Sequence, residues 1–215
     1  MARVLLATRN AKKLDELRRI LEPVAPAVVL VGLDDVPPYE EVPESGLTFA
    51  ENALIKAREG AAQVGLPTVA DDSGLAVDAL NGMPGVFSAR WAGQHGNQAE
   101  RDRANLDLLL AQIADVPDVH RAASFVCVAA LVFPDGRELT VEGTMRGRLV
   151  RAPRGDGGFG YDPIFVADGR DVTNAELTPA DKDGISHRGR AFRALAPTLT
   201  AALSAPRFPP RSRRS

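Results

Sequence analysis

The stretch Thr68–Val77, TVADDSGLAV, constrains the fold more than any other part of the chain. It begins with an apolar run suited to a buried strand and then places Asp71 and Asp72 side by side before Ser73 and Gly74. Successive side chains on a strand point to opposite faces of the sheet. The two carboxylates can therefore face the same way only if the strand breaks, and Gly74 tolerates the backbone angles of such a break.

Two interpretations of these carboxylates stay open from this stretch alone. Ligands of α/β proteins bind beyond strand ends, and two carboxylates beside a hydroxyl suit a hard metal ion such as Mg²⁺. The alternative is an Asx turn, in which Asp72 accepts backbone N–H groups after the strand.

Composition narrows the class of protein for this chain of 215 residues. Hydrophobic residues make up 45% and charged residues 25%, which is ordinary for a globular domain. The formal net charge of −2 gives no bulk attraction to nucleic acid or to an anionic membrane, so we expect neither as a partner. No apolar run approaches the ~20 residues of a membrane span. The single cysteine, Cys127, lies in an apolar run and fits a buried core position in a reducing, cytoplasmic compartment.

A basic turn lies between the first expected strand and the first expected helix. Residues 4–7 form a short apolar run, and apolar residues then recur at helical spacing from Leu14 until Pro23 ends the pattern. Side-chain donors in the turn, together with the free N–H groups of a helix start, bind phosphate well. The turn lacks glycine, so it is neither a Walker loop nor a dinucleotide fingerprint. An exposed basic turn without a ligand is the alternative interpretation.

A capping box predicts the second helix. Thr48 followed by Glu51 indicates the helix start, and Gly65 indicates its end. Glu44 lies just before this helix, whose far end leads into the Thr68–Val77 strand, so Glu44 is a candidate third carboxylate for a metal. Asn52 and Lys56 lie four residues apart, on one polar face of the helix.

The second half of the chain predicts a hairpin and two further helices. Residues 125–133 and 138–142 read as two strands joined by a tight turn, which makes them antiparallel and the sheet mixed. Polar residues 94–103 precede an apolar helical segment. In the last helix, Pro197 should kink or shorten the pattern. Residues 204–215 lack any periodicity, and we expect them to be disordered.

The glycine-rich stretch Gly155–Pro163 matches G-x-G-x-x-G only formally. No helix pattern follows it, so the context of a dinucleotide site is missing. Glycines allow backbone to approach a flat ligand, and Phe159 can stack on it. A tight hairpin with packed aromatic residues is the alternative.

Five motifs, in this order along the chain, resemble those of the inosine/xanthosine triphosphate pyrophosphatase family. They are Thr8-x-Asn10-x-x-Lys13, Ser45–Ala53 without Ala50, Ala70–Leu75, Phe159–Pro163 and Ser186–Gly189. Each motif alone is weak, but five in order are specific, and the resemblance extends from residue 4 to about residue 203. Residues 94–103, Pro197 and the Arg-rich tail have no counterpart in the pattern, and we expect none of them to touch a motif.

The resemblance implies an α/β domain over residues 1–203, with an elongated two-lobed shape. A central mixed β-sheet is flanked by helices, and the lobes enclose a long active-site cleft. It also implies a homodimer and a Mg²⁺-dependent hydrolase that cleaves ITP, dITP and XTP between the α- and β-phosphates. The products are the nucleoside monophosphate and pyrophosphate, which keeps non-standard purines out of DNA and RNA.

The resemblance further implies residue roles. Asp72 would be the catalytic base, and Glu44 and Asp72 would hold the metal. One carboxylate cannot easily be both a tight ligand and a free base, so Asp71 stays open for either role. The residues expected to bind substrate are Thr8, Arg9, Asn10, Ala11, Lys12, Lys13, Ser73, Phe159, Gly160, Tyr161, Asp162, Lys182, His187 and Arg188.

Selection of the base would depend on hydrogen bonding. Arg188 and His187 are candidate donors to O6 of the purine, and Asp162 is a candidate acceptor for N1–H. Arg188 could instead bind phosphate or cap the preceding turn. Two rival functions stay open: a Maf-like nucleotide pyrophosphatase with another base preference, and a nucleotide-binding protein without catalysis.

Overall fold

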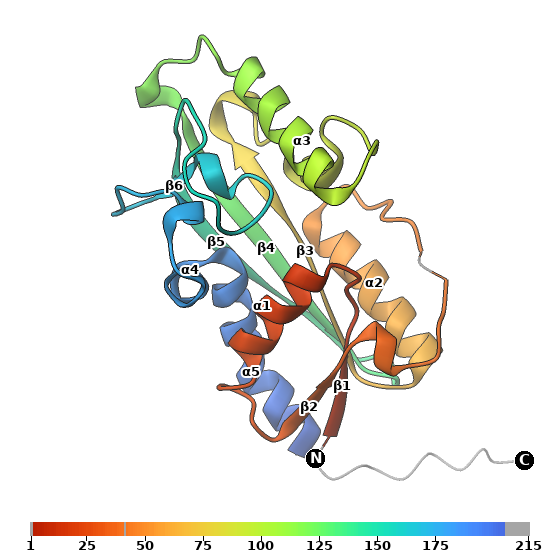
Figure 1. The fold of residues 1–215 in the computed structure, drawn as a ribbon. Coiled ribbons are helices and arrows are strands. Elements are labelled where there is room, and N and C mark those ends of the chain that lie inside the picture. The colour runs from red at the N-terminus through yellow and green to blue at the C-terminus, as the bar shows by residue number, and fades with distance from the viewer. Residues whose placement is uncertain (1, 41, 205–215) are drawn as a thin grey trace, which may run out of the picture.

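A six-stranded mixed sheet forms the middle of the molecule (Figure 1). The computed structural model describes residues 2–40 and 42–204. The strands, in the sheet order β2-β1-β3-β4-β5-β6, are β1 (Ala2–Leu6), β2 (Val28–Val31), β3 (Thr68–Val77), β4 (Ala122–Val132), β5 (Glu138–Leu149) and β6 (Phe165–Ala167). Strand β1 pairs in parallel with β2 and β3, whereas the other neighbours are antiparallel. The prediction of a mixed sheet is confirmed.

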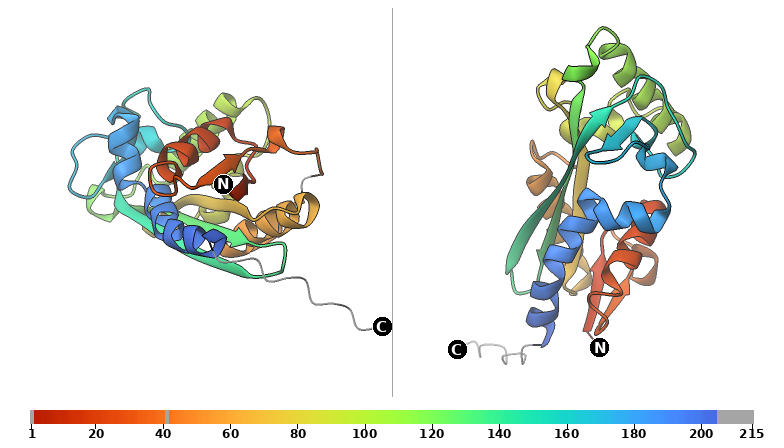
Figure 2. Two further views of the ribbon diagram at one scale, coloured as in Figure 1. Left: turned by 90° about the horizontal axis from the view of Figure 1, so that it is seen from below. Right: turned by 90° about the vertical axis from the view of Figure 1, so that its left-hand side faces the viewer.

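Helices flank this sheet along an elongated molecule (Figures 1 and 2). They are α1 (Ala11–Leu21), α2 (Phe49–Val64), α3 (Gln98–Gln112), α4 (Pro179–Ile185) and α5 (His187–Ser204). None of the helices in the described ranges is long and apolar enough to cross a membrane. The expected α/β fold, with helices flanking a mixed sheet, is confirmed.

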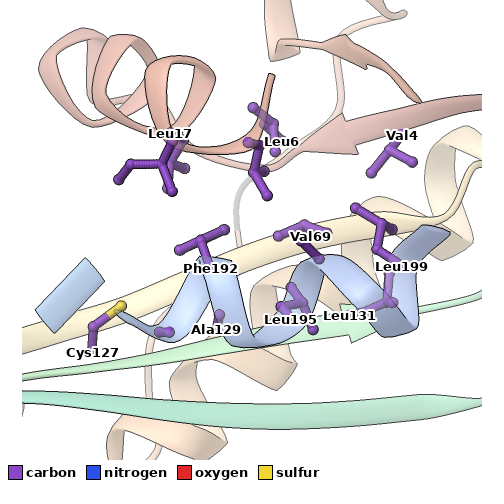
Figure 3. Packing of buried hydrophobic residues seen from close by; sticks show 14 of the residues in the cluster. Val4, Leu6, Leu17, Val69, Cys127, Ala129, Leu131, Phe192, Leu195 and Leu199 are labelled. Atoms are coloured by element: carbon purple, nitrogen blue, oxygen red, sulfur yellow. The ribbon is translucent and has the colours of Figure 1, made fainter. Parts of the chain in front are cut away.

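Alternation along β3 assigns the helices to the two faces of the sheet. Val69 packs with Leu17 of α1 and Phe192 of α5, in a cluster that also buries Cys127 (Figure 3). Ala70 points the other way and packs in the cluster of α2. Cys127 is fully buried, and burial raises the pKa of its thiol well above the ordinary value. The prediction of a buried core cysteine is confirmed.

A separate cluster lies further along β3. Leu75 shares its face of the strand with Val69, but it packs with Leu106 and Leu109 of α3 and with Phe125 of β4. Helices α1 and α5 therefore cover one end of this face, and α3 covers the other end. The residues of β3 between the two clusters are the polar Asp71 and Ser73.

The capping box and the terminal glycine predicted for α2 are confirmed, and side-chain caps also define the starts of α1 and α4. Thr48 and Glu51 form the reciprocal hydrogen bonds of the capping box at the start of α2, both at 3.1 Å. Gly65 ends α2 with φ of +69°. Asn10 caps α1, because its Oδ1 accepts the Lys13 N–H at 3.2 Å. Thr178 likewise caps α4.

Two expectations need correction, and a third concerns residues that are mostly outside the described ranges. Strand β3 does not break at Gly74, since its pairing with β4 continues to Val77. Gly74 is needed for another reason: a Cβ there would collide with the Gly85 carbonyl and the Ser88 hydroxyl. Pro197 does not shorten α5, which continues to Ser204. The rest of the expected disordered tail lies outside the described residues.

Candidate active site

A cavity of about 260 Å³ borders the edge of β3 that faces β1. Strand β1 pairs with β3 only at Thr68 and Val69. The next residues on this edge have no partner from β1, and Asp72, Ser73 and Gly74 border the cavity. Because the cavity lies at an edge, side chains from both faces of β3 reach it. The continuous strand therefore needs no break to bring a carboxylate and a hydroxyl to one site.

Most of the residues predicted from the sequence meet at this cavity. Those that line it are Thr8, Arg9, Asn10, Lys13, Glu44, Asp72, Ser73, Phe159, Gly160, Tyr161, Asp162, Lys182, His187 and Arg188. Ala11 and Lys12 do not line it. Both begin α1 with exposed side chains, and the Lys12 Nζ donates to the Gly158 carbonyl at 3.4 Å.

Asp71 is a buried, ionised carboxylate held by cations. Its Oδ2 lies 3.1 Å from Lys13 Nζ and 3.3 Å from Arg188 Nε, and it accepts the Ser73 hydroxyl at 3.2 Å. Burial by itself raises the pKa of Asp71, but the charges of Lys13 and Arg188 outweigh burial and hold it well below its ordinary value. Such a carboxylate is a poor proton acceptor, so the geometry does not favour Asp71 as the general base.

Asp72 points to the other face and has weaker partners. Its Oδ2 accepts the Asn52 amide at 3.1 Å, and Lys56 Nζ lies 3.8 Å from Oδ1. Burial raises the pKa of Asp72 above its ordinary value, and the charge of Lys56 opposes only part of this shift. Strand β3 continues through Asp72, so no turn follows the strand there, although Oδ1 does accept a backbone N–H, from Ser73 at 3.0 Å.

Glu44 and Asp72 both approach the same cation, the ammonium group of Lys56. Lys56 Nζ lies 2.6 Å from Glu44 Oε1, in addition to its approach to Asp72. Mg²⁺ is usually held by one or two carboxylates together with water and substrate phosphates, so this pair fits a metal that arrives with a polyphosphate. Within residues 2–40 and 42–204, no group of three or more His, Cys, Asp or Glu side chains is arranged to hold a metal.

Aromatic rings form the other end of the cavity. The ring of Phe159 has Lys182 Nζ at 4.9 Å and the Arg188 guanidinium carbon at 5.7 Å from its centroid. His187 stacks on Phe125 with centroids 4.9 Å apart and planes 12° from parallel. Burial lowers the pKa of His187 well below its ordinary value, and the nearby Arg188 lowers it further. A neutral imidazole among aromatic rings suits a flat, uncharged ligand group.

Arg188 and Asp162 already form hydrogen bonds with other residues of the protein. Arg188 uses all three nitrogens, since Nη1 bonds Glu16 at 2.5 Å and Nη2 bonds Ser73 at 2.9 Å in addition to the Nε contact. Asp162 accepts Lys182 at 2.6 Å and also accepts the Phe159 backbone N–H at 2.9 Å. Their proposed contacts with O6 and N1–H stay predictions.

Several residues at the site were missed by sequence reasoning. Glu16 is buried beside Arg188, three residues after Lys13 on the same helical face. The polar segment 94–103 also contributes: Asp102 Oδ2 accepts the Gly160 N–H at 3.3 Å, so the expectation that this segment touches no motif is wrong. A signal for this part of the site was present in the sequence, because polar residues recur between Gln98 and Asn105 at spacings of four and three, on one helical face. The cavity residues of α3 are Gln98, Asp102 and Asn105.

Comparisons with known proteins match nearly the whole chain to proteins of one family. The sequence model of the Ham1 family matches residues 4–198. A dITP/XTP pyrophosphatase of Nocardia farcinica is 66% identical over 202 residues, covering 94% of this chain and 96% of that protein. The crystal structure of a nucleoside-triphosphatase / dITP/XTP pyrophosphatase from Mycobacterium abscessus has 60% identity and a TM-score of 0.72, covering 91% and 99% of the two chains. A HAM1 protein structure from Coxiella burnetii has 41% identity and a TM-score of 0.81, covering 94% and 100%.

Proposed function

The chain belongs to the Ham1 family, and we propose that it hydrolyses the non-standard purine nucleoside triphosphates ITP, dITP and XTP. The products are the nucleoside monophosphate and pyrophosphate, and the reaction keeps these purines out of DNA and RNA. The observation that carries the proposal is one cavity with two unlike ends. Cations and two carboxylates line one end, and aromatic rings with a neutral imidazole line the other.

The phosphate end supports binding of a triphosphate. The turn from Thr8 to Asn10 borders the cavity, and the start of α1 directs free N–H groups and a partial positive charge toward an anion. Lys13 and Lys56 add point charges, which interact with phosphate without the fixed geometry of a guanidinium. These cations stabilise the charge that develops on the leaving pyrophosphate, which is usually a large part of catalysis.

Asp72 is the residue best suited to take the proton of the attacking water. The water oxygen bonds to the α-phosphorus, the bond between the α-phosphorus and the bridging oxygen breaks, and pyrophosphate leaves with that electron pair. Asp72 accepts the water proton. Its raised pKa makes it a better acceptor than Asp71, whose pKa is held down by two cations.

Mg²⁺ is part of the proposal. Glu44 and Asp72 would hold it, as their convergence on Lys56 supports. When bound, Mg²⁺ neutralises negative charge on the phosphate oxygens. Asp72 could act as ligand and base only if its two oxygens divided these roles, and Asn52 holds one of them in place.

The test is pyrophosphate release from ITP, dITP, XTP, GTP and ATP by purified protein, with and without Mg²⁺. We expect fast release from the first three substrates, slow release from GTP and ATP, and loss of release without Mg²⁺. A preference for other bases would favour a Maf-like enzyme. Nucleotide binding without pyrophosphate release would favour a protein without catalysis.

A homodimer and a cytoplasmic location belong to the same proposal. Both are expected from the family resemblance, and a single cysteine without an intrachain partner is compatible with a reducing compartment. Sedimentation at micromolar concentration tests the dimer, since a species of one-chain mass would contradict it.

A further inference from the structure

We propose that Asn105 of α3 is a specificity-determining residue that reads the C2 position of the purine. The inference rests on the proposed function and concerns the same cavity. It would explain how the site distinguishes xanthine and hypoxanthine from guanine, which has the same O6 and N1–H groups.

Asn105 is a buried amide at the aromatic end of the cavity. Only 2% of the residue is exposed, and it lines the cavity. The next residue, Leu106, packs in the same cluster as Phe125, and Phe125 stacks on His187. Asp102, three residues before Asn105 on the same face of α3, accepts the N–H of Gly160, the residue after Phe159, at 3.3 Å. This contact brings that face of α3 to the end where a base would bind.

The direction of the Asn105 amide is determined by its neighbour. Its Oδ1 accepts the Ala92 backbone N–H at 2.7 Å. A backbone N–H can only donate, so the oxygen and nitrogen of the amide cannot be exchanged without losing this bond. Within the described parts of the chain the Asn105 amide forms no other hydrogen bond, and the residue lines the cavity. Nδ2 is therefore a donor of fixed orientation that a ligand in the cavity can meet.

Neighbouring hydroxyl groups cannot take this role as readily. The Tyr161 hydroxyl donates to the Ser88 carbonyl at 2.9 Å. The Ser88 hydroxyl donates to the Gly85 carbonyl at 2.6 Å and accepts the Leu75 N–H at 2.9 Å. Their protons are directed to backbone carbonyls, whereas Asn105 retains two N–H groups for a ligand.

Donors across the cavity from α3 favour an orientation of the base in which C2 faces α3. Lys182, His187 and Arg188 come from α4 and the start of α5, and α3 lies on the other side of the glycine-rich loop from α4 (Figure 1). A base stacked on Phe159 with O6 toward these donors turns the C2–N3 side of its ring away from them, toward α3.

The three bases differ at C2 in a way that a fixed donor can read. Xanthine has a carbonyl oxygen there, which would accept the Asn105 N–H. Hypoxanthine has a hydrogen atom at C2, which requires no hydrogen-bond partner. Guanine has an amino group, so two donors would face each other in a buried site, and neither would have an acceptor. A buried polar mismatch of this kind is worth about tenfold or more in selectivity.

The test reverses the hydrogen-bonding character of Asn105. Asn105→Asp retains an acceptor for the Ala92 N–H and replaces the donor by an acceptor. We expect kcat/KM for XTP relative to ITP to fall about tenfold, and that for GTP relative to ITP to rise about tenfold. The matched control is Asn97→Asp at the start of the same helix. Its Oδ1 also accepts a backbone N–H, from Glu100 at 3.1 Å, and it does not line the cavity.

A second variant keeps the inference testable if the buried carboxylate prevents folding. Asn105→Ala removes the donor without adding charge, so the XTP to ITP ratio should fall while the GTP to ITP ratio rises less than in Asn105→Asp. Equal losses on all three substrates, or unchanged ratios, would overturn the inference alone. Absence of pyrophosphate release by the wild-type protein would overturn the proposed function and the inference with it.

Discussion

Asp71 and Asp72 are neighbours in sequence but lie in opposite electrostatic environments. Asp71 faces α1 and α5, where Lys13 and Arg188 contact the same carboxylate oxygen. Asp72 faces α2, where its side-chain partners are the Asn52 amide and Lys56 at 3.8 Å. Both carboxylates are buried, yet the pKa of Asp71 is lowered and that of Asp72 is raised.

The difference shows that burial alone does not decide the role of a carboxylate. Desolvation raises the pKa of both side chains. Two cations in direct contact outweigh desolvation at Asp71, whereas a more distant one does not at Asp72. The strand therefore offers a structural anion on one face and a candidate proton acceptor on the other.

The largest expected effect is on turnover. Asp72→Asn removes the proton acceptor and one metal-binding carboxylate, and we expect kcat for ITP to fall by about 10²–10⁴-fold. The fold should be retained, because an amide fits the same space and can still accept the Asn52 bond. Steady-state kinetics measure the loss of turnover, and circular dichroism shows whether the fold is retained. Turnover near that of the wild-type protein would contradict the assignment of Asp72.

Asp71→Asn should act mainly on stability. It leaves the buried Arg188 and the partly buried Lys13 without their shared anion, and breaking a buried ion pair costs about 3–5 kcal/mol. Urea unfolding monitors this loss. Glu16 still pairs with Arg188, so we expect the lower end of that range. A variant as stable as Asp72→Asn would contradict the contrast between the two faces.

Lys13→Ala should weaken triphosphate binding, with a rise in KM of about tenfold and a smaller change in kcat. Lys12→Ala is the matched control, since Lys12 is the preceding residue but does not line the cavity. Equal effects of the two substitutions would show that Lys13 has no specific place among the phosphates.

The smallest expected effect is on the pH dependence of stability, and it has opposite signs for the two carboxylates. The lowered pKa of Asp71 stabilises the fold above the unfolded value of about 3.9, and this contribution is lost as the pH falls below that value. The raised pKa of Asp72 makes stability fall as the pH rises from about 3.9 through its folded value.

Unfolding of the metal-free wild-type protein and both variants across pH 2–7 separates these contributions. Asp71→Asn should lose the increase in stability with pH below about 4, and Asp72→Asn should lose the decrease above it. The same pH profile in both variants would show that the two faces of β3 do not differ electrostatically.

Local sequence signals were sufficient to predict several secondary-structure elements and the family. Caps such as Thr48 with Glu51 and Asn10 with Lys13 act within one helical turn, so their signal is complete in a few residues. The apolar start of the Thr68–Val77 stretch likewise predicts a buried strand. Five motifs in order were enough to predict the fold class and most of the cavity lining.

The contacts of each polar residue could not be predicted from local sequence, because they depend on how distant segments pack together. Asp71 receives Arg188 from 117 residues away and Lys13 from 58 residues away, and no local pattern specifies such pairs. Gly74 looked like a strand break but is required by close packing against Gly85. Asn105 faces the site only because α3 packs beside the cavity. Hydrogen bonding and charge depend on distances in space, and these exist only after the helices have packed on the sheet.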